Sequence, residues 1–240
     1  MRPFLFLRLQ TVSNSKNIAS RKQKIMARNS AEAAYDEIKR QILAGTLRPA
    51  ERLVESTLAE NLQASRHNIR TALDRLQNDG LVEIEANKGA RVRSLTLEEV
   101  LDMYVAREGL EAEVVRLATM HITDEQLEEL RDCLQAMKEA FASSKFDQYS
   151  NLNRQFHKVI YAASGNHTLP ELISQIILQL ARLNMRVILL PGRRDTSLYE
   201  HSAIYEAIAQ RDTERAVQAI RQHISGVRTD IENGWEIVRI

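Results

Sequence analysis

The chain has 240 residues, with 33 lysines and arginines against 32 aspartates and glutamates. This length allows one or two domains with a substantial core, and the near-balance of charge argues against a protein that coats nucleic acid nonspecifically. The single cysteine, Cys133, excludes an intramolecular disulfide framework and is typical of a reducing compartment. No apolar run is long enough to cross a bilayer, so we expect a cytoplasmic protein without a membrane partner.

Residues 1–29 differ from the rest of the chain because they contain basic residues and no carboxylate. A terminal segment of this composition predicts a disordered basic arm. Such an arm could add nonspecific affinity for DNA.

Residues 53–92 contain two successive segments of helical hydrophobic period and then a segment of alternating period. Turn residues separate the segments. After a helix at about Ala31–Ala44, the pattern predicts two shorter helices at about Val54–Asn61 and Arg66–Asp79. Two alternating runs, residues 81–85 and 90–93, then predict a β-hairpin. The order of elements is that of a winged helix-turn-helix domain, which we expect to span residues 30–93.

The helix expected at Arg66–Asp79 has two different faces. Aliphatic residues recur with helical spacing on one face, which predicts burial of Ile69, Ala72, Leu73 and Leu76. Polar residues gather at the amino end and are Ser65, Arg66, His67, Asn68 and Arg70, of which Ser65 is the expected N-cap. This combination is typical of a helix that reads the major groove of DNA.

The hairpin carries further cations beside this helix. Asn87, Lys88 and Gly89 predict a tight basic tip, in which Gly89 supplies a positive φ, and Arg91 follows on the second strand. A basic tip of this kind would contact the sugar-phosphate backbone or the minor groove. A small protein-binding domain with solvated cations is the alternative, but the clustering on two adjacent elements favours DNA.

Residues 35–49 and 58–92 resemble GntR-superfamily transcriptional regulators. The matching segments are Tyr35–Gly45 with Leu47–Pro49, Leu58–Glu60, Ser65–Arg66, Ile69–Leu73, Leu76, Gly80–Val82 and Lys88–Val92. The resemblance implies that Arg48 points toward the DNA-reading side. Two departures are Gln63, where the family usually has a turn glycine, and His67–Asn68, which replace a common Thr-Pro pair.

From Thr96 to the C-terminus the hydrophobic period stays near 3.6, which predicts an all-α bundle over residues 94–240. Thr96 and Glu99 form an expected capping box at its start. The expected helices are at about Leu97–Met120, 123–142, Phe146–Ala163, Leu169–Leu190, Leu198–Arg211 and Thr213–Gly234.

His157, His201 and His223 each lie on an apolar face of a different expected helix. Three imidazoles that converge inside a bundle could bind Zn²⁺, Ni²⁺ or Mn²⁺ and leave coordination positions open. The alternative is that each is a hydrogen-bonded core residue.

The bundle also resembles the FCD branch of the GntR superfamily, through Phe156–His157, Ser164–Asn166 and the pattern of its late helices. The resemblance implies a metal site in which these histidines are ligands and Asn153 stands at the position of the family's aspartate. It also implies a small carboxylate or sugar-acid effector. Arg107 matches the arginine of the family's Arg-x-x-Leu-Glu motif and could bind that carboxylate, or it could pair with Glu111 one turn later.

The sequence therefore predicts a repressor that binds a double-stranded DNA operator as a homodimer and responds to an organic-acid effector. We do not expect an enzyme, because the chain has no nucleophile elbow, no glycine-rich phosphate loop and no His-Glu-x-x-His helix. A metal-dependent hydrolase fused to a DNA-binding module is one alternative, although it lacks an identifiable general base. A regulator whose bundle only dimerises, without a ligand, is the other.

Overall fold

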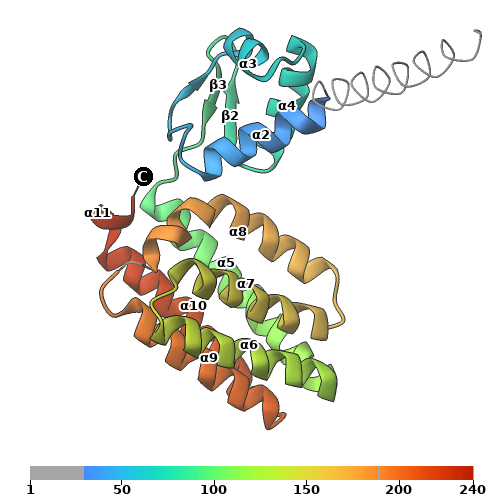
Figure 1. Ribbon diagram of the computed structural model, residues 1–240, viewed down its shortest axis with the longest axis vertical. Helices are drawn as coiled ribbons and strands as arrows, with labels where there is room; N and C mark the ends of the chain where they lie inside the picture. The colour runs from blue at the N-terminus through green and yellow to red at the C-terminus, as the bar shows by residue number, and fades with distance from the viewer. Residues whose placement is uncertain (1–29, 189, 240) are drawn as a thin grey trace, which may run out of the picture. The chain divides into compact units, whose positions relative to one another are not determined.

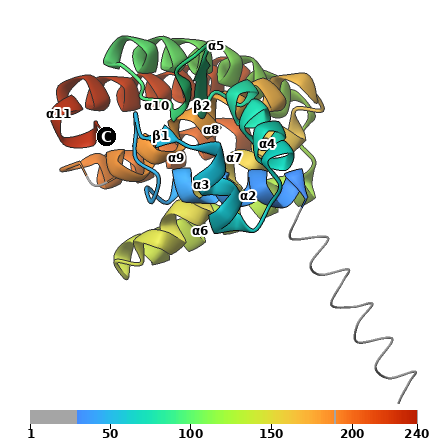
Figure 2. The ribbon, with the colours of Figure 1, turned by 90° about the horizontal axis from the view of Figure 1, so that it is seen from above.

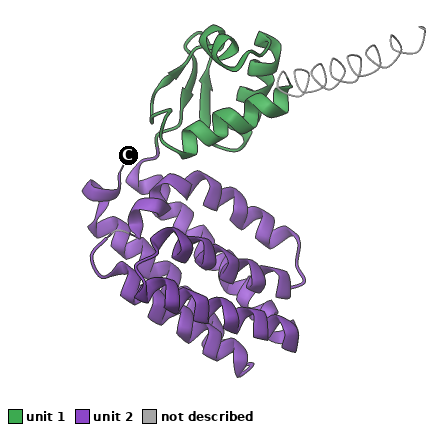
Figure 3. Cartoon of the chain, viewed as in Figure 1, with its two compact units in different colours: residues 1–94 green, residues 95–240 purple. Residues whose placement is uncertain are grey.

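The computed structural model describes residues 30–188 and 190–239, and the chain divides into two compact units between Ser94 and Leu95 (Figure 3). The basic arm expected at residues 1–29 lies outside the described residues. Within the described ranges, no helix combines the length and the apolar character needed to span a membrane.

The first unit is a winged helix-turn-helix, as the sequence predicted (Figure 1). Its elements are α2 (Ala31–Leu43), β1 (Arg52–Leu53), α3 (Glu55–Leu62), α4 (Arg66–Asn78), β2 (Val82–Glu85) and β3 (Gly89–Val92). The strands form an antiparallel sheet in the order β1-β3-β2. Arg91 on the central strand β3 pairs with Arg52 of β1 on one side and with Glu83 of β2 on the other. The sequence analysis did not predict β1, because two residues are too few to show an alternating pattern.

The core of this unit forms where α2 packs on α4. Ile38, Ile69 and Leu76 are completely removed from solvent, and each such side chain contributes about 1.5–3 kcal/mol to folding through burial. The Tyr35 hydroxyl donates a hydrogen bond to the Asp79 carboxylate and so ties α2 to the end of α4. The aliphatic face predicted for α4 is therefore the face that holds the helix in place.

The turn between α3 and α4 contains a left-handed residue that is not glycine. Gln63 has φ 53° and ψ 38°, and its backbone N–H caps α3 through the carbonyls of Ala59 and Glu60. A side chain with a Cβ costs about 1–2 kcal/mol in this conformation. Gln63 therefore makes the left-handed turn that the resemblance assigns to a glycine, despite the strain.

The second unit is an all-α bundle, again as predicted (Figures 1 and 2). Its helices are α5 (Leu97–His121), α6 (Asp124–Ala142), α7 (Phe146–Ala163), α8 (Thr168–Val187), α9 (Arg193–Ala209), α10 (Thr213–Asn233) and α11 (Trp235–Val238). Capping boxes at Thr96 and Thr123 begin α5 and α6. Helix α5 packs against α7, α8 and α10, and these four helices surround the site described below.

The largest differences from the sequence prediction are two helix boundaries and one additional helix. Helix α8 ends at Val187 rather than Leu190, α9 begins at Arg193 rather than Leu198, and the short α11 was not predicted. The first turn of α9 was missed because it is polar in sequence. Its first residue, Arg193, is nevertheless buried, and an ion pair to Glu200 two turns later holds it there.

Candidate functional site

The amino end of α4 presents the side chains that the sequence proposed for DNA contact. Ser65 caps the helix, with its Oγ accepting a hydrogen bond from the Asn68 backbone N–H at 3.1 Å. Arg66, His67 and Arg70 are exposed beside it. The free N–H groups and the positive end of the helix dipole favour a phosphate at this place.

Arg70 is held by a residue that the sequence analysis missed. Its Nη2 and Nε lie 2.9 Å and 3.2 Å from the two carboxylate oxygens of Glu55, at the start of α3. The hydrogen bond from Arg70 lowers the pKa of Glu55. The pair fixes the guanidinium in one position, and DNA must compete with Glu55 for it.

The cations of the wing are paired in a similar way. Lys88 Nζ lies 2.6 Å from Glu85, while Arg91 contacts both Glu83 at 2.8 Å and Glu85 at 2.5 Å. Asn87 and Gly89, at φ 65° and 85°, form the tight tip that the sequence predicted. The missed carboxylates lie on one face of β2 because they are two residues apart, and the strand register places Glu83 opposite Arg91.

Two of the arginines proposed to contact DNA are not part of these ion pairs. Arg48 and Arg66 are exposed, and neither makes a salt bridge with any residue that the structure describes. The backbone N–H of Arg48 donates to Glu51 at 2.8 Å, which orders the turn after α2. These two guanidiniums can contact phosphate without first losing an internal carboxylate partner.

In the second unit, the three histidines meet as the sequence proposed. His157 from α7, His201 from α9 and His223 from α10 each offer a ring nitrogen, and these nitrogens lie within 4.8 Å of one another. The Nε2 atoms of His157 and His201 are 3.3 Å apart.

The other ring nitrogen of each histidine faces an oxygen. His201 Nδ1 lies 2.6 Å from the Ser197 carbonyl, and His223 Nδ1 lies 2.8 Å from Glu200. His157 Nδ1 is 3.3 Å from Glu111, without the angles of a hydrogen bond. Because an oxygen acceptor favours the proton on Nδ1, the contacts of His201 and His223 favour the tautomer in which Nε2 can act as a ligand.

The environment keeps two of these imidazoles neutral. Burial is the largest cause that lowers the pKa of His201 and of His223 well below the ordinary value, and repulsion from neighbouring histidines adds to it. A neutral imidazole is the form that binds a metal ion.

The donor set fits a divalent metal. Two nitrogens that bind one tetrahedral ion at about 2.0–2.1 Å are about 3.3 Å apart, which is the separation found between His157 and His201. Asn153 lies one turn before His157, and its buried Oδ1 has no hydrogen-bond partner among the described residues. A buried oxygen of this kind requires an explanation, and a metal ion supplies one. An amide carbonyl oxygen is a weaker metal ligand than a carboxylate.

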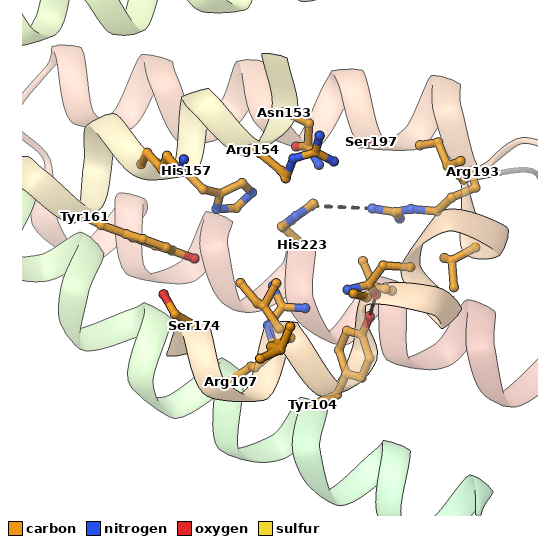
Figure 4. Close-up of a pocket in the computed structure, with 18 residues that line it drawn as sticks. Tyr104, Arg107, Asn153, Arg154, His157, Tyr161, Ser174, Arg193, Ser197 and His223 are labelled. Carbon is orange, nitrogen blue, oxygen red and sulfur yellow. Dashed lines mark hydrogen bonds between the residues drawn. The ribbon is translucent and has the colours of Figure 1, made fainter. Parts of the chain in front are cut away.

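A cavity of about 430 Å³ opens beside the histidines (Figure 4). Its polar wall includes His157, His223, Arg107 and Arg193, whereas α8 contributes mainly apolar side chains. Arg107 donates from Nε and Nη2 to one oxygen of Glu111, at 3.0 Å and 2.6 Å, so the salt bridge considered in the sequence analysis does form. The same guanidinium also lines the cavity.

A winged helix-turn-helix in one unit and a helical unit with a cavity beside a histidine cluster in the other are typical of DNA-binding regulators with a ligand-binding domain. Comparison with protein families gives the same result. Residues 30–92 match the family described as bacterial regulatory proteins, gntR family, and residues 102–226 match the FCD domain. The chain belongs to the GntR family of transcriptional regulators and carries an FCD domain.

Individual relatives agree with this assignment. The chain is 30% identical over 195 residues to the uncharacterized HTH-type transcriptional regulator YdhC of Bacillus subtilis, covering 80% of this chain and 86% of YdhC. It is 29% identical over 202 residues to the HTH-type transcriptional repressor GlaR of Escherichia coli, covering 79% and 90%. The solved structure of E. coli McbR/YncC shares the fold, with TM-score 0.69, 22% identity and coverage of 85% and 98%. YdhC and GlaR are described as transcriptional regulators, which favours regulation over the hydrolase alternative.

Proposed function

We propose that this protein is a cytoplasmic repressor that binds operator DNA as a homodimer and releases or retains it according to an organic acid bound in the helical cavity. The observation that carries the proposal is the pairing of two sites in one chain. One is an exposed basic helix end, and the other is a cavity lined by buried arginines and by His157 and His223, two of the three clustered histidines.

The DNA part of the proposal rests on α4 and the wing. Helix α4 would enter the major groove with Arg66, His67, Asn68 and Arg70 toward the base edges, and Ser65 at its amino end toward a phosphate. Arg48, Lys88, Gly89 and Arg91 would contact the backbone on either side. Two such heads on one dimer would bind two half-sites, so the operator would be a pseudo-palindrome.

The effector part rests on the cavity. His157, His201 and His223, with Asn153, would hold Zn²⁺, Ni²⁺ or Mn²⁺, and the ion would attract a carboxylate of the ligand. Arg107 would supply a second positive group on the same side. A tenfold change in operator affinity on ligand binding requires about 1.4 kcal/mol of coupling between the sites.

The experiment is selection of bound sequences from a random double-stranded library, followed by anisotropy titration of the enriched duplex against a scrambled duplex of the same composition. We expect at least a hundredfold preference at moderate salt, because specific sites are typically bound 10³-fold or more tightly than random DNA. Equal affinity for the two duplexes would contradict the proposal. Sedimentation of the complex gives the number of protomers per duplex.

A further inference from the structure

The cavity has a polar wall and an apolar wall. Helix α8 supplies most of the apolar wall, and α10 adds one residue. The apolar lining residues are Ile177, Leu178, Ala181, Val187, Ile188 and Val227. Ile177, Leu178 and Ile188 are only partly buried, so hydrocarbon surface remains for a ligand to cover.

Much of the hydrogen-bonding capacity of the polar wall is already used inside the protein. Arg193 pairs with Glu200 at 2.7 Å and with Asp230 at 3.2 Å. The Tyr104 hydroxyl donates a hydrogen bond to Oδ1 of Asn184, a lining residue on α8, at 2.6 Å. The amide oxygen of Asn184 is therefore already paired. A ligand with many hydroxyl groups would therefore leave several of them unpaired, and each unpaired buried group is costly.

Two of the polar groups that remain, Lys158 and Tyr161, lie one turn apart on α7. The Tyr161 side chain is only 9% exposed, and its hydroxyl has no hydrogen-bond partner among the described residues. Figure 4 shows this hydroxyl directed into the cavity. Burial raises the pKa of Tyr161 well above its ordinary value, so the hydroxyl keeps its proton and can donate. Lys158, also in the lining, forms no salt bridge with a described residue.

We propose that the ligand is a carboxylic acid with a compact hydrocarbon body, an aliphatic chain or an aromatic ring, and is not a polyhydroxylated sugar acid. The inference rests on the proposed effector function and specifies its ligand class. The carboxylate lies beside Tyr161 and Lys158 on α7, and the hydrocarbon lies against the α8 wall. A volume of about 430 Å³ accommodates such a molecule.

The test is calorimetric titration of the full-length protein, supplied with Zn²⁺, with butanoate, hexanoate, octanoate, 3-phenylpropanoate and gluconate. Burial of one methylene group increases affinity about fourfold, so affinity should rise by about that factor per added carbon until the cavity is full. Gluconate should bind at least tenfold more weakly than hexanoate.

Two variants locate the binding groups. Ile177→Ser should weaken octanoate at least tenfold but leave butanoate within threefold, because it changes only the apolar wall. Leu172→Ser is the matched control, since Leu172 is on the same helix, 42% exposed and outside the cavity lining, and it should change neither acid. Tyr161→Phe should weaken every acid severalfold, because it removes the donated hydrogen bond and keeps the ring.

The possible failures are distinct. Gluconate binding as tightly as hexanoate, or an affinity that does not depend on chain length, would overturn the ligand class and leave the effector function standing. If neither kind of acid binds, both are overturned, whereas the operator titration described above still decides DNA binding on its own.

Discussion

Arg70 on the recognition helix and Glu55 on the preceding helix form a two-point ion pair, with both carboxylate oxygens engaged. The pair is exposed, since the Arg70 side chain is 67% accessible, so it contributes little to the stability of the fold. Under the proposed function, its main effect would be on DNA binding. The carboxylate cancels the charge of Arg70 until a base or phosphate replaces it, which penalises random DNA that offers no good replacement.

Glu55→Gln should therefore raise affinity for random DNA severalfold and make the logarithmic salt dependence steeper by up to about one unit, because one more cation becomes available to phosphate. Anisotropy titrations across a salt series measure both quantities. Glu60→Gln is the control, since Glu60 is an exposed glutamate on the same helix that has no salt bridge in the described structure. An unchanged salt slope in Glu55→Gln would show that the pair does not restrain Arg70.

Arg70→Ala removes the arginine itself and tests its proposed contact with a base. It should reduce preference for the selected operator at least tenfold, because a bidentate contact to a base discriminates by about 1–3 kcal/mol. The melting temperature should change little, since only an exposed ion pair is lost. Gel shifts with operator and scrambled competitor distinguish this outcome from general weakening, which would mean that Arg70 contacts only phosphate.

Gln63→Gly should stabilise the first unit by about 0.5–1 kcal/mol. Relief of the left-handed strain stabilises the folded state by about 1–2 kcal/mol. The greater conformational entropy of glycine in the unfolded chain offsets part of this gain. Denaturant unfolding measures the difference. At Arg211, another non-glycine residue with positive φ, the guanidinium donates to the Ile122 carbonyl, so Arg211→Gly should not give the same gain.

The sequence predicted the elements better than it predicted the partners of its charged residues. The period of α4 identified its buried face, and the helical spacing of His157, His201 and His223 identified the cluster, because both depend on local periodicity. The Glu55–Arg70 and Glu200–His223 contacts join different helices, and only tertiary packing brings them together. The buried start of α9 was missed for the same reason, since Arg193 reads as a surface residue until its carboxylate partners are known.

Acid should destabilise the metal-free protein through its buried histidines. The folded-state pKa of His201 and of His223 is lowered, so below about pH 6.5 the unfolded chain binds protons that the folded chain does not. Stability is therefore unaffected by these groups above that pH, and it falls by up to about 1.4 kcal/mol per pH unit per histidine below it. Urea unfolding of chelator-treated protein from pH 7.5 to 5.5 measures the slope. His201→Asn should have the shallower slope, and equal slopes would contradict the assignment.

Metal uptake should require the histidines together. His157→Ala combined with His201→Ala removes two of the three nitrogens, so the variant should retain no stoichiometric Zn²⁺ or Ni²⁺ by elemental analysis after dialysis. His121→Ala with His167→Ala removes two exposed histidines instead and should leave uptake intact. Undiminished metal in the first variant would remove the cluster as the site.

Gly226 leaves room beside the Glu200 carboxylate that contacts His223. A Cβ at this position of α10 would lie 2.9 Å from Glu200 Oε1, so Gly226→Ala should push the carboxylate away from the imidazole it orients. Loss of such a supporting carboxylate typically weakens metal binding about 10–100-fold, which competition with a chromophoric chelator measures. Gly109→Ala is the matched control, because it also lies within a helix but its Cβ would meet nothing within 4 Å. It should leave metal affinity unchanged and stabilise α5 by about 0.5–1 kcal/mol. Equal metal affinity in the two variants would mean that Glu200 does not support His223.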